Sequence, residues 1–126
     1  MDNSVALAIL IPMTVAIGIG LWMGWRYLQG QRNRPGLVAT HFLLATAPLE
    51  AMAAMMRGAP NGVLAAARDT LSWSAALTAA ALLSGLFTAI IAKSHPHIIG
   101  MSLALHAGIG SLGFMALVWW GIRIAA

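Results

Sequence analysis

The chain has 126 residues, of which 60% are hydrophobic and 8% charged, and its mean hydropathy is +0.85. A soluble domain carries about 25% charged residues, so this composition excludes a water-soluble protein and indicates a chain embedded in a lipid bilayer. It contains no cysteine, which excludes disulfides, iron–sulfur clusters and thiolate zinc sites. Its net charge of +4 comes from Lys and Arg residues beside apolar runs, so we expect contacts with lipid and no nucleic-acid partner.

The first half of the sequence predicts two membrane spans, since about 20 mostly apolar residues cross a bilayer. The first, residues 5–25, contains no ionisable side chain and ends with Trp25 beside Arg26, a pair typical of the membrane–water interface. The second, residues 36–56, contains His41.

The second half predicts two more spans. Residues 71–92 form the third, for which Asp69 or Thr70 is a suitable N-cap. Residues 98–122 form the fourth, which contains His106. The predicted fold is therefore all-α: an integral membrane four-helix bundle that occupies residues 1–126 as a single transmembrane domain.

The distribution of bases predicts the orientation of the bundle. No Lys or Arg precedes the first span, whereas Arg26, Arg32 and Arg34 follow it. The positive-inside rule then places the first and third connections in the cytoplasm and both termini outside, in a bacterial inner membrane.

An internal repeat relates the two halves. A single ungapped offset places Gly20 on Gly85 and His41 on His106, so that the separation between glycine and histidine is the same in both halves. We interpret the chain as two tandem two-helix repeats, residues 1–61 and 66–126, in parallel orientation. The second and fourth spans then run the same way, with both histidines at one depth.

The histidine pair is the candidate site, because an ionisable residue inside a span indicates function. The side chains that share a helical face with each histidine, at i+4 and i+7, are small or compact and leave room for a flat macrocycle. They are Ala45, Pro48, Gly110 and Gly113. Two neutral imidazoles, from His41 and His106, can act as the two axial ligands of the iron of haem b.

Basic residues lie on the same membrane side as the predicted pair. Arg32 and Arg34, with Arg26 and Lys93, are placed to contact haem propionates. Arginine binds a carboxylate through two parallel hydrogen bonds, which suits this role.

Other interpretations of the same residues remain open. A neutral histidine can bond a backbone carbonyl or hydroxyl of the next helix, and small residues also allow close helix packing. With His95 and His97 the pair makes four histidines, which can hold copper, zinc or iron, and one can bond a quinone. His95-Pro96-His97 also suits a plain loop, and Glu50 suits a proton relay or a contact with a partner.

The motifs His41-x-x-x-Ala45 and His106-x-x-x-Gly110 resemble those of small membrane cytochromes b, including the b561-like group. The resemblance covers about a third of the chain. The b561-like pattern has two haems and four ligand histidines, on both membrane sides. With two span histidines on one side, the resemblance here implies one haem.

The sequence thus predicts a small integral subunit that binds one b-type haem and exchanges electrons with quinone or a partner complex. We expect an electron-transfer or accessory subunit rather than an enzyme by itself, and partners that are other membrane subunits or further copies of the chain. The alternative is a non-catalytic accessory or assembly subunit of a larger membrane complex with structural histidines.

Overall fold

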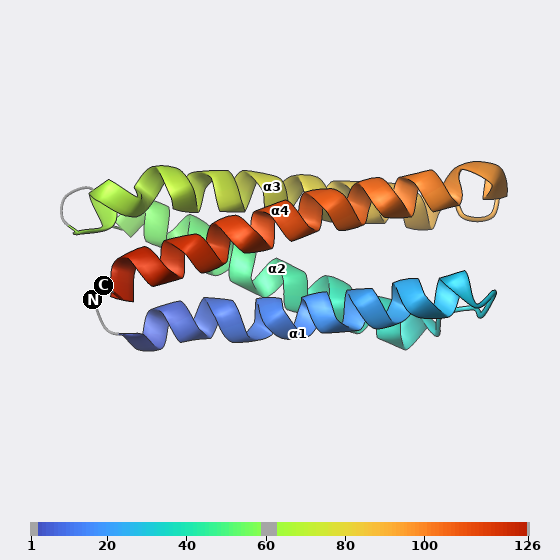
Figure 1. The fold of residues 1–126 in the computed structure, drawn as a ribbon, viewed down its shortest axis with the longest axis horizontal. Helices are drawn as coiled ribbons and strands as arrows, with labels where there is room; N and C mark the ends of the chain where they lie inside the picture. The colour runs from blue at the N-terminus through green and yellow to red at the C-terminus, as the bar shows by residue number, and fades with distance from the viewer. Residues whose placement is uncertain (1–2, 59–62, 126) are drawn as a thin grey trace.

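A computed structural model describes residues 3–58 and 63–125, and four long helices make up most of this part (Figure 1). Their bounds are α1 Asn3–Leu28, α2 Pro35–Gly58, α3 Val63–Ile91 and α4 Ile99–Ala125, with a short 3-10 helix, η1 Pro96–Ile98, before α4. Each long helix contains a segment long and apolar enough to cross a membrane. The all-α prediction is confirmed, and the chain is that of an integral membrane protein.

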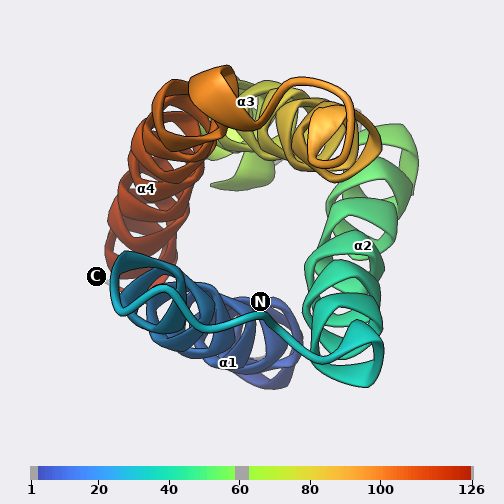
Figure 2. The same cartoon turned by 90° about the vertical axis from the view of Figure 1, so that its right-hand side faces the viewer.

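The four helices alternate in direction and form a ring in chain order (Figure 2). Helix α1 packs against α2 and α4, and α3 packs against α2 and α4. Helices α2 and α4 therefore lie on opposite sides of the bundle axis and run the same way. This arrangement lets one residue of α2 face one residue of α4 at a similar depth.

Helix α3 begins earlier than the hydropathy of its sequence suggests. It starts at Val63, whereas we predicted the third span from residue 71, and Asp69 lies inside the helix. The predicted N-cap at Asp69 or Thr70 is therefore wrong, because the leucine and alanines of residues 64–67 favour helix regardless of hydropathy. The sequence also predicts a turn at Pro60-Asn61-Gly62, which lies outside the described residues.

The best-packed core lies at the end of the bundle where α1 begins and α4 ends. Large side chains from all four helices are buried there, among them Ile9, Met52, Leu71, Leu117 and Trp120. The α1–α2 and α3–α4 hairpins converge at this end and diverge toward the two connections (Figure 1). The connection end is where the sequence predicts the candidate site.

Candidate haem site

Each span histidine is bonded to the preceding helix of its own hairpin. Nδ1 of His41 in α2 lies 2.8 Å from the carbonyl oxygen of Ala16 in α1, and Nδ1 of His106 in α4 lies 2.8 Å from that of Ala81 in α3. A carbonyl oxygen only accepts, so each Nδ1 carries the proton and donates it. Each Nε2 is then unprotonated and keeps a lone pair for another partner.

A glycine on the neighbouring helix makes room for each imidazole. A Cβ atom at Gly20 would lie 3.0 Å from Cε1 of His41, and one at Gly85 would lie 2.8 Å from Cε1 of His106. Any larger residue would meet the ring. The equal separation between glycine and histidine in the two halves of the sequence thus reflects a packing contact in each hairpin.

The two imidazoles lie side by side inside the bundle. Their ring centroids are 6.0 Å apart and their planes meet at 77°. Both side chains are half-buried. The structure therefore brings together the two histidines that the sequence predicts as a pair.

The 6.0 Å between the ring centroids is a distance found both in edge-to-face ring contacts and between two imidazoles that bind one metal. Metal–imidazole bonds of about 2.0–2.1 Å place the ring centroids on opposite sides of one metal roughly 6 Å apart. Histidines that bind metals almost always donate their other N–H to a carbonyl or carboxylate, as His41 and His106 do. The bonded Nδ1 atoms and the unprotonated Nε2 atoms therefore give both histidines the chemistry of metal ligands.

Haem iron and a bare metal ion take different numbers of protein ligands. The described residues contain no cluster of three or more His, Cys, Asp or Glu side chains that can hold a metal. A bare zinc ion takes three or four protein ligands. Haem supplies four nitrogens of its own and needs only two axial ligands. Two histidines match the number of protein ligands that a haem iron takes.

The small residues predicted to clear space beside the histidines have other neighbours in the structure. A Cβ at Gly110 would lie 3.7 Å from Cβ of Ala81, and one at Gly113 would lie 3.1 Å from Cβ of Leu77. Both glycines thus bring α4 close to α3. Ala45 is half-buried in α2. A role for these three residues beside a haem stays a prediction.

The predicted basic residues lie on the α1–α2 connection. The carbonyl oxygen of Arg32 accepts a hydrogen bond from Nη2 of Arg26 at 3.1 Å. Arg34 lines a pocket together with Arg26. Neither observation tests the predicted contact of Arg32 and Arg34 with haem propionates, which stays a prediction.

His95 and His97 lie on the second connection. Both are exposed, with ring centroids 6.1 Å apart, and Nδ1 of His95 lies 2.9 Å from Oγ of Ser94. They form no metal cluster with the span histidines in the described part of the chain.

Hydroxyl groups that sequence reasoning did not single out occur in the second hairpin, and one of them lies within hydrogen-bond distance of His106. Oγ of Ser84 lies 3.3 Å from Nδ1 of His106, and Oγ1 of Thr88 lies 2.5 Å from Oγ of Ser102. Under the offset that places His41 on His106, the matching positions of the first hairpin hold apolar residues: Ile19, Met23 and Leu37. The two histidines therefore share their backbone contacts but differ in polarity around them.

No protein-family model, no curated protein and no solved structure matches the chain. The likeness to small cytochromes b therefore rests on the two histidine motifs alone.

Proposed function

We propose that this protein binds one b-type haem between His41 and His106 and acts as a small electron-transfer subunit of a membrane. One observation carries the proposal. Two imidazoles lie with their centroids 6.0 Å apart, and each has its Nδ1 bonded to a backbone carbonyl so that Nε2 is free.

The surroundings of the pair suit electron transfer. When bound, the haem supplies a one-electron redox couple. Held by His41 and His106 together, the haem would serve electron transfer rather than the binding of a substrate. The carbonyls of Ala16 and Ala81 fix the orientation of the rings and raise their basicity as ligands. With helices that expose mainly apolar side chains, the natural electron partners are a quinone in the bilayer or another membrane subunit.

We also propose that the bundle arose by duplication of a helical hairpin. The same ungapped offset relates the residues of the two halves and also the contacts that these residues make. Ala16, Gly20 and His41 have the counterparts Ala81, Gly85 and His106. Because each unit has two helices, both units run in the same direction through the membrane.

The charge distribution supports a membrane orientation. The connection end carries four bases, Arg26, Arg32, Arg34 and Lys93, and the sequence places no Asp or Glu near it. The opposite end carries three bases. The proposed topology has the connections in the cytoplasm and the other end outside, in a bacterial inner membrane.

A second function is favoured by the same hydrogen bonds. The bonds from His41 to Ala16 and from His106 to Ala81 join the helices of each hairpin without any ligand. If that were their whole role, the protein would be an accessory subunit of a membrane complex. A cofactor measurement distinguishes the two functions.

The test is a reduced-minus-oxidised visible spectrum of the full chain, purified in detergent from haem-supplied cells. We expect a haem α-band that is lost in His41→Ala and in His106→Ala. His95→Ala and His97→Ala are matched controls on the connection and should keep the band. Circular dichroism and gel filtration establish that each variant is folded.

Two outcomes would contradict the haem proposal. A folded wild-type protein with no α-band would leave the accessory role. A band that survives both span substitutions would show that other residues bind the haem.

A further inference from the structure

We propose that Arg26 and Arg34 bind the phosphate of an anionic phospholipid in a groove between α1 and α2. This site is separate from the histidine pair, since neither histidine lines it. We thereby assign Arg26 and Arg34 to a lipid phosphate in place of the haem propionates expected from the sequence, and the binding of haem by His41 and His106 does not depend on this assignment.

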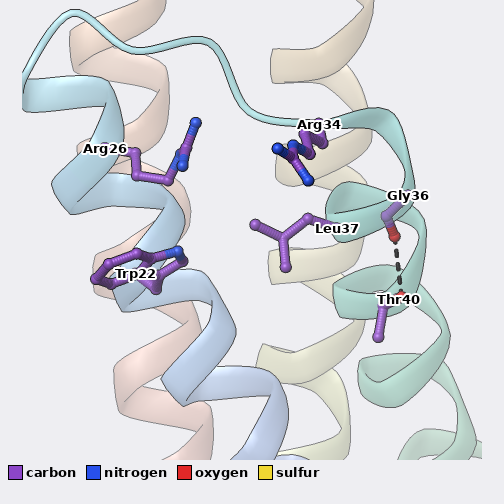
Figure 3. Close-up of a pocket in the computed structure, with 6 residues that line it drawn as sticks. All are labelled: Trp22, Arg26, Arg34, Gly36, Leu37 and Thr40. Carbon is purple, nitrogen blue, oxygen red and sulfur yellow. Dashed lines mark hydrogen bonds between the residues drawn. The ribbon is translucent and has the colours of Figure 1, made fainter.

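The groove lies between the end of α1 and the start of α2. Its volume is about 610 Å³, and it is lined by Trp22, Arg26, Arg34, Gly36, Leu37 and Thr40. The side chain of Arg26 enters it from the last turn of α1 and that of Arg34 from the residue before α2, and the two turn toward each other (Figure 3). Trp22 and Leu37 lie below the two arginines, on the side away from the connection. The groove thus has a polar end, formed by the arginines, beside an apolar surface formed by Trp22 and Leu37.

The connection between the helices is folded so that it positions Arg26. Gly30 adopts a left-handed conformation, φ 72°, that turns the chain back. Nδ2 of Asn33 then donates to the carbonyl of Met23 at 3.1 Å, and the carbonyl of Arg32 accepts from Nη2 of Arg26. These bonds hold one guanidinium in the groove before any ligand arrives.

Arg34 is positioned by the start of α2. Its carbonyl accepts hydrogen bonds from the backbone N–H groups of Leu37 and Val38, at 3.0 and 3.2 Å. Arg34 is therefore the residue that immediately precedes α2, where the N-terminal end of the helix dipole adds positive potential.

The groove has hydrogen-bond donors and no anion of its own. Nε of Arg26 is buried and has no hydrogen-bond partner, although buried donors are almost always paired. The three acids of the chain are Asp2, Glu50 and Asp69, none of which belongs to this end of α1 or α2. Two guanidinium groups without a carboxylate call for an anionic acceptor, and phosphate oxygens accept from both.

A phospholipid fits the position of the groove better than a free anion does. The end of α1 exposes Trp22, Trp25 and Tyr27, aromatic residues that lie at the level of lipid headgroups. Below the arginines, the apolar surface of Trp22 and Leu37 suits an acyl chain. Basic pockets between spanning helices recognise acidic lipids by this combination.

The test uses the full chain, delipidated in detergent and titrated with phosphatidylglycerol or phosphatidylcholine, with bound lipid counted by native mass spectrometry. We expect selective retention of phosphatidylglycerol. Arg26→Gln and Arg34→Gln should each weaken its binding roughly fivefold, and the double variant more than twentyfold. Arg57→Gln/Arg123→Gln, at the opposite end, is the matched control and should bind as wild type. Arg34 is exposed, so its variant tests the site even where Arg26→Gln fails to fold.

Three outcomes would overturn the lipid site. One is equal retention of the two lipids by wild type, and another is an equal loss in the Arg57/Arg123 control. The third is displacement of phosphatidylglycerol by inorganic phosphate at a similar concentration, which would assign the groove to a free phosphate. His41→Ala should bind phosphatidylglycerol as wild type does. The absence of a haem band and the absence of lipid binding therefore test the two proposals independently.

Discussion

At the scale of single residues, glycines and histidines act in pairs. A histidine in a membrane helix has to satisfy its N–H within the protein, because lipid offers no acceptor. The carbonyls of Ala16 and Ala81 accept those N–H groups, but only because Gly20 and Gly85 let the rings come close. The glycine in each pair is therefore as necessary to the site as the histidine.

This pairing predicts that Gly85→Ala damages the site more than Gly20→Ala. The new Cβ would lie 2.8 Å from Cε1 and 3.0 Å from Nδ1 of His106, whereas at Gly20 the nearest atom is 3.0 Å away. We expect Gly85→Ala to lower the free energy of unfolding in mixed detergent micelles by about 1–3 kcal/mol, as overpacking does. It should also weaken any haem band.

Gly18→Ala is the matched control, because a Cβ there meets no atom within 4 Å. Its stability should be unchanged, or raised by up to about 1 kcal/mol through helix propensity. A Gly85→Ala variant as stable as Gly18→Ala would contradict the role assigned to the glycine–histidine pair.

At the scale of elements, small residues and one buried hydroxyl join α3 to α4. Gly113 places its backbone against Leu77 and Thr78, and Oγ of the fully buried Ser74 donates to the carbonyl of Gly113 at 2.9 Å. Lipid tails are as apolar as leucine, so close packing and interhelical hydrogen bonds drive such association. A small residue at position 113 is therefore needed where the two helices meet.

Gly113→Ala should loosen this contact. Its Cβ would lie 3.2 Å from the backbone nitrogen of Thr78, which cannot rotate away as a side chain does. We expect a loss of about 1–3 kcal/mol in the free energy of unfolding. Gly108→Ala, on the same helix and facing open space, should leave stability nearly unchanged. Equal effects of the two substitutions would show that α3 and α4 do not pack through Gly113.

At the scale of the whole molecule, the four spans can be predicted from the sequence, because each long apolar run is suited to cross the bilayer as a helix. The closeness of His41 and His106 is also predictable, since an ungapped offset preserves depth along two parallel helices. The carbonyl partners of the histidines, Ala16 and Ala81, cannot be predicted from the sequence. Every residue has a backbone carbonyl, and only the register between the two helices of a hairpin determines which carbonyl lies beside the histidine. The groove of Arg26 and Arg34 is likewise hidden in sequence, since it depends on the turn at Gly30.

The positive charge of the molecule is greater at one end, and this predicts how it sits in the membrane. The connection end carries four bases, and the sequence places no acid near it, whereas Arg57, Arg68 and Arg123 belong to the other end. Translocating the connections would move every one of those four bases across the bilayer. The natural absence of cysteine makes the orientation simple to measure.

Single cysteines introduced at Gln31 and at Ser94, both exposed in the connections, should resist a membrane-impermeant maleimide in intact bacterial cells. A cysteine appended after residue 126 should react, since the end of α4 lies on the opposite side of the bundle. After lysis all three should react, which controls for burial of the thiol. Labelling of Gln31→Cys before lysis would invert the proposed topology. It would also place Arg26 and Arg34 at the outer leaflet of the membrane, and the anionic phospholipid that we propose they bind would then have to be present in that leaflet.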